Sequence, residues 1–489
     1  MKKIVVSLAV FFIFSLPLAA EQLSVYDCLN VALKNNQDIK NAVLAFKQND
    51  LDQMKVLSRY IPSVGAGYTR AEIDEPSANS TFNTYPLRST SLAPSVAWAI
   101  PGGGVLKADW AFQFNHLTIS PLPEDAYTRK LTFSLVQPLL KDFFLIPSDI
   151  NILRMAASSR RIAAMAIDQA SQAVAYNAYL TFISLIINDL NVAVKAASLD
   201  RSRFLLQKNE QNRSLGIVED TDILGAKAAL NLRVVDYISS TNQRNDIYNN
   251  LRLLMNTTDD FEVNPDIGMI CGTAKSNYDP EAEVREALSN RIEVRMLGEQ
   301  SRIQRINIQI LGSKLLPQLN FIGSYSTYGN ALTADQADAM MRDDPKHSWT
   351  AGVQFSMPLF PLGEIDELKK QRLELEKTAN SLEKTREQIR SQIVSKINEI
   401  LTLRVRLADM ADAVGFQREK LMKESEKYKI GRSATRTVIM YQDDLQNAET
   451  LELQLKLQYF VAVASLDFLK GRLLTSCGII PAGTTDRFK

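Results

Sequence analysis

The segment WTAGVQFSM, residues 349–357, places an apolar side chain at every odd position and a small or polar one between them. After a short link with two prolines, residues 364–414 contain no Gly or Pro and carry apolar residues at steps of three and four. A period of two is typical of a β-strand with two unlike faces, whereas steps of three and four are typical of a helix. The sequence therefore predicts a strand that runs into a helix of unusual length.

The same alternation recurs in other short segments. It is clear in 106–115 and 131–136 and less regular in 319–325. Segments of about ten residues with aromatic side chains near their ends have the length and period of outer-membrane strands. Two intervening stretches, 74–90 and 330–346, are polar and predict loops. A soluble β-sandwich would show the same alternation, but it would not continue into very long helices.

A second helical stretch, residues 148–215, also lacks Gly and Pro. A helix of about 65 residues would be roughly 100 Å long, and such a length implies packing in a bundle or a coiled coil. A plain periplasmic coiled-coil protein without channel activity is the alternative for these stretches. The membrane-type strands argue against it.

The sequence contains an internal repeat. The interval from Ala32 to Pro62 equals the interval from Ala287 to Pro317, and both intervals begin in a similar apolar-periodic helix. Residues 134–140 resemble 355–360, and 214–217 resemble 429–432, in the same order in both halves. The period is too long for a solenoid repeat, so it indicates duplication of a half-molecule.

These patterns divide the chain into four parts. We expect a signal peptide at 1–20, a first repeat at 21–270, a second repeat at 271–475 and a C-terminal tail at 476–489. The first repeat is expected to hold helices at 24–60, strands at 61–72 and 129–138, a hairpin at 91–115 and a long helical hairpin at 147–255. The second is expected to hold helices at 280–316, strands at 317–328 and 348–358, and a long helical hairpin at 363–470.

The N-terminus predicts export. Lys2 and Lys3 precede a short apolar core at 4–16, and Ala19-Ala20 offers a cleavage site, which together form the pattern of a secretory signal. No cysteine follows closely enough to predict a lipid anchor. Beyond the signal, no window holds 18 uninterrupted apolar residues, so we expect either a soluble periplasmic chain or strands in an outer membrane.

Composition excludes several classes of function. The 489 residues carry a formal net charge of +1, which gives no basic surface for nucleic acid. The histidines, His116 and His347, stand alone in expected loops, and no phosphate loop, metal spacing or nucleophile motif is present. We therefore expect no enzyme, no metal and no cofactor, and we interpret Asp443-Asp444 as a solvated helix face. Three cysteines, Cys28, Cys271 and Cys477, are too few for a disulfide framework.

In the order and spacing of these segments, residues 22–475 resemble the TolC-like outer membrane efflux protein family. The resemblance implies a mixed α and β channel-tunnel made of three copies, with a β-barrel in the outer membrane and a helical barrel across the periplasm. It implies a passive exit duct of a tripartite efflux pump or a type I secretion system. The implied partners are two further copies, a periplasmic adapter, an inner-membrane pump and outer-membrane lipid.

The resemblance also locates two helical reversals where the adapter would dock. They fall on Leu215, Gly216, Ile217 and Val218, and on Ile430, Gly431, Arg432 and Ser433. Glycine tolerates the left-handed backbone that a tight reversal needs. Acidic residues follow the first tip and basic residues surround the second, namely Glu219, Asp220 and Asp222 against Lys427, Lys429, Arg432 and Arg436.

Some members of the family close their entrance with an Asp on the first hairpin, held by a Tyr and an Arg on the second. The matching positions here hold Asp222, Tyr428 and Ser433, with Arg432 beside the last. We expect contact between Tyr428 and Asp222 to keep the entrance closed. Two acidic positions that bind cations in those members fall on Thr437 and Met440, so a cation block is not expected here.

The hairpin at 91–115 departs from the family, which has four strands per copy. Pro101 and three following glycines are a strong reversal signal. We expect a 12-stranded barrel with this hairpin as an extension outside it. The alternative is an 18-stranded barrel that includes it.

Overall fold

A computed structural model describes residues 22–76, 84–118, 123–141, 148–214, 218–263 and 277–479. The expected signal peptide, Leu215, Gly216, Ile217 and Cys271 therefore lie outside the described residues. The chain divides into two compact units. We call residues 43–166 and 293–385 the sheet unit, and residues 1–42, 167–292 and 386–489 the hairpin unit.

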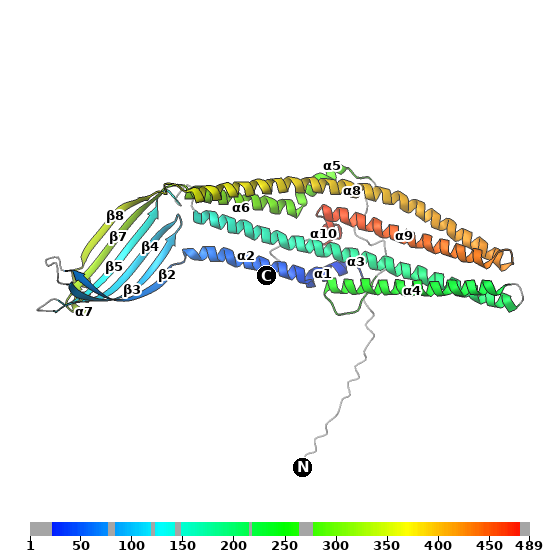
Figure 1. Cartoon of the computed structure of the whole chain (residues 1–489), viewed down its shortest axis with the longest axis horizontal. Coiled ribbons are helices and arrows are strands. Elements are labelled where there is room, and N and C mark those ends of the chain that lie inside the picture. Colours follow the sequence, from blue (N-terminus) through cyan, green and yellow to red (C-terminus); the bar gives the residue numbers. More distant parts are fainter. Residues whose placement is uncertain are drawn as a thin grey trace, which may run out of the picture. The chain divides into compact units, whose positions relative to one another are not determined.

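The sheet unit contains one antiparallel sheet of six strands in the order β2-β3-β4-β5-β7-β8 (Figure 1). The strands are β2 (Ser63–Pro76), β3 (Thr84–Ile100), β4 (Gly104–Thr118), β5 (Pro123–Pro138), β7 (Gln318–Ala331) and β8 (Lys346–Ser356). Each strand pairs with the next in a continuous ladder. The outer strands, β2 and β8, each have one edge without a partner strand in the described chain.

The chain connects four helices to the strands of this sheet. The chain runs from α2 (Gln37–Leu57) through a 3-10 turn at Ser58–Tyr60 into β2, and from α6 (Ile292–Lys314) into β7. It leaves β5 towards α3 (Ser148–Ser214) and β8 towards α8 (Leu362–Lys429). Because neighbouring strands alternate in direction, all four connections lie at the same end of the sheet. A short helix, α7 (Ala334–Asp343), joins β7 to β8 at the other end.

The hairpin unit is built around the rest of α3 and α8. It adds α1 (Val25–Asn35), α4 (Asp220–Met255), α5 (Pro280–Asn290), α9 (Thr435–Leu469) and α10 (Leu473–Ser476), with a parallel pair of β1 (Gln22–Leu23) and β6 (Glu262–Val263). Caps define the helix starts: Ser24 and Asp27 form a capping box on α1, and Asp279 caps α5 ahead of Pro280. The core centres on Tyr179, Phe182, Ile183, Leu251 and Met255.

The two halves of the chain match in length as well as in order. Helices α1 and α5 have 11 residues each, and α3 and α8 have 67 and 68. Helices α4 and α9 have 36 and 35 residues. The predicted duplication therefore appears in the elements themselves, except between the strands of each half: the first half has β3 and β4 there, and the second has α7.

Three expectations were wrong. The hairpin near 91–115 is not an extension of a four-stranded sheet, because β3 and β4 lie inside the sheet, hydrogen-bonded between β2 and β5. Residues 84–90 belong to β3, and the stretch 330–346 contains α7. In 84–90, polar residues had suggested a loop, yet polar side chains are compatible with a strand when one face of the sheet is polar throughout. In 330–346, Thr333 caps a short helix, because its side chain accepts from the Gln336 N–H.

Helix α3 contains a window that is long and apolar enough to cross a membrane by length and composition. Its side chains Tyr179, Phe182 and Ile183 are buried in the core of the hairpin unit. Core packing therefore accounts for part of its apolar character.

The two described cysteines are both buried in that core. Burial, and secondarily the charge of Asp27, raises the pKa of the Cys28 thiol to about 12. A thiol with so high a pKa stays protonated at neutral pH and reacts slowly, because the thiolate is the nucleophile.

Candidate functional site

The ladder register divides the sheet into two faces of opposite character. Side chains that pair across the strands share a face, so parity and register assign every position. The apolar face carries Val64 and Tyr68, Leu92 and Val96, Leu106 and Trp110, Leu131 and Phe133, Phe321 and Tyr325, and Trp349 and Val353. The polar face carries Gly65 and Thr69, Ser91 and Ser95, Asp109 and Gln113, Thr128 and Thr132, Ser324 and Ser326, and Thr350 and Gln354.

The polar face is held by hydrogen bonds between strands. Thr69 and Ser91 hydroxyls lie 2.6 Å apart, and those of Thr132 and Ser326 lie 3.0 Å apart. Its charged residues include Lys107 and Asp109, which form an ion pair of 2.6 Å. Small, hydrogen-bonded polar side chains and this ion pair make the face suited to contact with water.

The apolar face ends in polar groups and aromatic rings near both ends of the strands. Near the helical end, Trp98 Nε1 donates to the backbone oxygen of Tyr60 at 2.9 Å. Near the other end, Arg129 lies over the Phe112 ring and pairs with Asp338 of α7 at 2.8 Å. Helix α7 packs so closely on β7 that a Cβ at Gly329 would meet the α7 backbone. An apolar belt between such boundaries is the pattern of a lipid-facing surface.

The helices of the sheet unit lie in the same order as the strands they adjoin. Arg160 of α3 pairs with Asp50 of α2 at 2.6 Å. Arg161 of α3 pairs with Glu299 of α6 at 3.0 Å, and α6 contacts α8 through a buried hydrogen bond of 2.8 Å from Gln304 to Thr378. The order is therefore α2-α3-α6-α8, and α2 and α8 are the outer helices just as β2 and β8 are the outer strands.

The second tip is a tight reversal between α8 and α9. Gly431 has a left-handed backbone with φ of 72°. The Gly431 N–H donates to Tyr428 O at 3.1 Å and the Arg432 N–H donates to Lys427 O at 2.9 Å, which is the Schellman pattern of helix ends. Ile430 and Arg432 are exposed, while Ser433 donates to Glu424 at 2.6 Å.

At the first tip the structure describes Val218 but not the three residues before it. Arg213 at the end of α3 and Asp220 at the start of α4 form an ion pair of 2.8 Å across the reversal. On the second tip, Lys427 pairs with Glu424 at 3.2 Å. Among the described residues, ion pairs reach neither Glu219 and Asp222 on the first tip nor Lys429, Arg432 and Arg436 on the second, so these five groups remain available to a partner.

Tyr428 joins the two helical hairpins through a residue that the sequence did not single out. Its hydroxyl donates to Asn209 Oδ1 of α3 and lies 3.4 Å from Thr435 Oγ1 of α9. Thr435 also donates to Asn209 Oδ1, at 3.3 Å. Asn209 and Thr435 are buried. Within the described chain, the hydrogen bonds of Tyr428 therefore go to this polar triad and not to Asp222.

A network of charges joins the hairpins further along. Arg233 of α4 pairs with Asp443 of α9. Glu449 of α9, itself buried, pairs with Arg418 of α8 at 2.9 Å and with Arg201 of α3 at 3.8 Å. Burial lowers the pKa of Arg201 despite the nearby Glu449. Asp443 thus links two hairpins, whereas the sequence had suggested a solvated helix face.

Away from the tips, Lys470 after α9 is almost fully buried against α5. It pairs with Glu283, and with Glu286 at 2.9 Å. Arg472 pairs with Glu286 at 2.6 Å. This four-residue cluster ties the end of the second hairpin to the start of the second repeat.

The remaining predicted positions carry no charge cluster. Thr437 and Met440 lie in the first turns of α9, half-buried and exposed respectively. His116 lies 2.6 Å from Asp125, and His347 lies 2.9 Å from the Tyr325 hydroxyl, both on the sheet. Within the described part of the chain, groups of three or more His, Cys, Asp or Glu with metal-ligand geometry are absent.

Sequence reasoning missed Asn209 and the charge network. A signal for Asn209 did exist, because it follows Leu205 by one helical step of four in the apolar seam of α3. A buried polar residue in such a seam needs a partner. The partners come from α8 and α9, more than 200 positions away, which no local pattern indicates.

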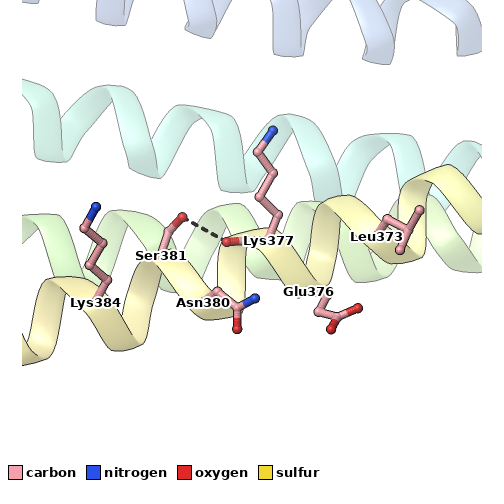
Figure 2. A pocket seen from close by; sticks show the side chains of 6 residues that line it. All are labelled: Leu373, Glu376, Lys377, Asn380, Ser381 and Lys384. Atoms are coloured by element: carbon pink, nitrogen blue, oxygen red, sulfur yellow. Dashed lines mark hydrogen bonds between the residues drawn. The ribbon is translucent and has the colours of Figure 1, made fainter.

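A surface hollow lies on α8 (Figure 2) and does not resemble a ligand site. Its lining comes from one face of a single helix: Leu373, Glu376, Lys377, Asn380, Ser381 and Lys384. Ser381 Oγ donates to Lys377 O of the same helix at 2.9 Å. It is an exposed stripe of helix.

A sheet with one apolar and one polar face, edged by strands that lack a partner in the described chain and adjoined by four helices, is the pattern of a membrane-embedded β-sheet protein. Residues 284–472 match the family described as "Outer membrane efflux protein", and the chain therefore carries this domain. The match confirms the predicted family and its outer-membrane location. No curated protein matches the sequence.

Solved structures show that the fold extends beyond the matched domain. The outer-membrane channel OprN is 14% identical, with a TM-score of 0.69 over 91% of this chain and 89% of that one. The CmeC outer membrane channel of Campylobacter jejuni is 15% identical, with a TM-score of 0.66 over 92% and 86%. The open state of the MtrE channel of Neisseria gonorrhoeae is 13% identical, with a TM-score of 0.66 over 92% and 89%. The channel-tunnel fold predicted from the sequence is confirmed.

Proposed function

We propose that this chain is the passive outer-membrane duct of a tripartite exporter and that three copies form the channel. The observation that carries the proposal is the sheet with one apolar and one polar face, whose strands lead into helices of 67 and 68 residues. Lipid would cover the apolar face and water would fill the space along the polar face. The cargo would be chosen by the pump that the duct serves.

Self-association is supported by what a single copy leaves exposed. Open strand edges in lipid leave backbone groups unpaired, at a cost of several kcal/mol each. In the hairpin unit, exposed apolar side chains follow α4 and α8, namely Leu232, Val235 and Ile238, and Val405, Phe416 and Met422. Neighbouring copies would bury these seams as packed helices do.

The helical tips are proposed as the docking site of a periplasmic adapter that links the duct to an inner-membrane pump. The residues concerned are those predicted above, 215–218 and 430–433. The uncompensated charges support the proposal: acidic Glu219 and Asp222 stand on one tip, and basic Lys429, Arg432 and Arg436 on the other. An adapter with an alternating charge pattern would meet both in register.

The entrance is proposed to close through Tyr428, with Asn209 as its partner in place of Asp222. The triad connects α3, α8 and α9, so the two hairpins cannot separate without breaking it. Asp222 and Arg432 remain available for contacts between copies. Single exposed pairs contribute only about 0–1 kcal/mol, so the buried triad would dominate the closed state.

Fractionation tests the proposal against a periplasmic structural protein. A duct should appear in the outer-membrane fraction as a trimer that dissociates only on heating. Recovery of the chain from the soluble periplasm would refute the proposal. Photo-crosslinkers at Val218 and Ile430 should capture an adapter, and the same crosslinker at exposed Glu376 of α8 serves as the control.

A further inference from the structure

We infer that β3 and β4 are membrane-spanning strands of the barrel, so that six strands from each of three copies close an 18-stranded barrel. The inference rests on the proposed function and changes its dimensions. It contradicts the four strands per copy that the family resemblance implied. It also assigns the polar faces of β3 and β4 to the lining of the duct.

The first argument is the ladder. Strand β3 pairs with β2 from Ser63↔Ala97 to Pro76↔Thr84, and β4 pairs with β5 from Val105↔Val136 to Thr118↔Pro123. Strands β2 and β5 have no direct pairing with each other. Removing the hairpin from the membrane would therefore leave β2 without a partner strand in the described chain and would expose one edge of β5, whose other edge pairs with β7. Lipid penalises both losses.

The second argument is the continuity of the apolar face. Leu92, Val96 and Trp98 of β3 and Leu106, Trp110 and Phe112 of β4 stand on the same face as Phe133 and Tyr325. Val96, Trp98 and Trp110 are between 43% and 51% exposed in the single copy. A hairpin in water would gain nothing from such a face, whereas a hairpin in lipid needs it.

The third argument is the circumference of the barrel. Because the outer strands and the outer helices of the sheet unit coincide, we compare the circumference of the barrel with that of a ring of four helices per copy. Twelve helices spaced about 9–10 Å apart span about 110–120 Å. Eighteen strands spaced about 4.8 Å apart and tilted by about 40° span about 110 Å, but twelve such strands span only about 75 Å.

The directions of the outer strands also allow the barrel to close. Strands β2 and β8 run in opposite directions because the sheet has an even number of alternating strands. The β8 edge of one copy can therefore pair antiparallel with the β2 edge of the next copy. All three junctions are then equivalent, and no edge remains.

Lipid contact of individual positions tests the inference. Cys28, Cys271 and Cys477 are first replaced by serine, and single cysteines are introduced and labelled with an environment-insensitive fluorophore. Val96→Cys and Ala108→Cys probe the apolar face of β3 and β4, and Ser91→Cys and Ala111→Cys probe the polar face. Ala351→Cys and Ser324→Cys are matched references on β8 and β7. The trimers are reconstituted into bilayers with and without brominated lipid.

We expect brominated lipid to quench the labels at 96 and 108 as strongly as the label at 351. The labels at 91, 111 and 324 should be unaffected. If the label at 351 is quenched and those at 96 and 108 are not, the hairpin lies outside the membrane and the inference fails, while the duct stands. If the label at 351 is not quenched either, the proposed function itself fails. All six substitutions introduce small side chains, and heat-modifiable migration of each trimer shows that it has assembled.

Discussion

Tyr428 shows how a single hydroxyl can couple two long hairpins. Its bond to Asn209 joins α8 to α3, and both residues contact Thr435 at the start of α9. A buried polar group that loses its partner costs about 1–3 kcal/mol. In the proposed closed entrance, the triad would therefore contribute more than any exposed ion pair at the tips.

We predict that Tyr428→Phe raises the open probability of single channels in planar bilayers, because Asn209 Oδ1 keeps only Thr435. Asn209→Leu should have a similar effect, and the double variant should open little more than either single one, since both remove the same contact. Tyr26→Phe, at an exposed tyrosine of α1, is the control. Full additivity of the two single effects, or an effect of Asp222→Ala as large as theirs, would contradict this assignment.

The buried Lys470–Glu283 pair predicts a strong asymmetry between single and double variants. Lys470→Met leaves Glu283 buried next to a neutral side chain and should destabilise the hairpin unit by about 3–5 kcal/mol. Lys470→Met combined with Glu283→Leu should recover much of this loss, because both charges are removed. Thermal unfolding in detergent measures both, and equal destabilisation by the single and double variants would argue against a coupled pair.

Glu286 makes the same cluster sensitive to acid. Burial alone would raise the pKa of Glu286, but hydrogen bonds and charges from Lys470 and Arg472 outweigh it and hold the pKa below its ordinary value of 4.5. A lowered folded-state pKa contributes stability that is fully present above 4.5 and is lost as the pH falls through the folded-state value. Melting temperature should therefore drop below pH 4.5 less steeply in Glu286→Gln than in the natural chain. Glu281→Gln, at an exposed glutamate of the same helix, should keep the natural slope.

At the scale of the element, a substitution at Gly431 would measure the cost of a left-handed backbone without any change in side-chain contacts. Its φ of 72° is unfavourable for any residue with a Cβ, although a Cβ there would meet nothing within 4 Å. Gly431→Ala should therefore destabilise the tip by about 1–2 kcal/mol. Gly415→Ala, within α8 and equally free of contacts, should stabilise it by about 0.5–1 kcal/mol.

Hydrogen exchange of the α8 and α9 ends can measure both glycine variants. Faster exchange near the tip in Gly431→Ala and slower exchange in Gly415→Ala are the expected results. Equal responses would show that the left-handed backbone does not limit this reversal.

At the scale of the whole molecule, the proposed trimer would bury the apolar seams of α4 and α8 between its copies. Phe416 is 72% exposed in the single copy, and burying a phenylalanine contributes about 1.5–3 kcal/mol. Phe416→Glu should therefore reduce the yield of heat-modifiable trimer, as measured by unboiled gel electrophoresis. Phe416→Leu keeps the side chain apolar and should assemble nearly normally; equal yields from both variants would place Phe416 outside the interface.

Much of this architecture could be predicted from the sequence because it depends on periodicity. The alternation at 349–357 and the long Gly-free and Pro-free stretches specify strands and helices locally, and the equal spacing of the halves reveals the duplication. The position of the 91–115 hairpin could not be predicted this way, because its turn says that two strands pair but not what lies on either side of them. The role of Asn209 could not be predicted for a related reason, since its hydrogen-bond partners belong to the other repeat.

The unpaired edges of β2 and β8 make the delay between export and assembly important for biogenesis of the proposed trimer. In the proposed assembly, a copy that has not yet met its neighbours would present two strands able to pair with any other strand, including those of unrelated proteins. Such a copy would be prone to aggregate, because the wide sheet enlarges its exposed apolar surface. Productive maturation should therefore depend on periplasmic chaperones that shield these edges and on a local supply of copies. A slow or dilute supply would favour degradation over insertion.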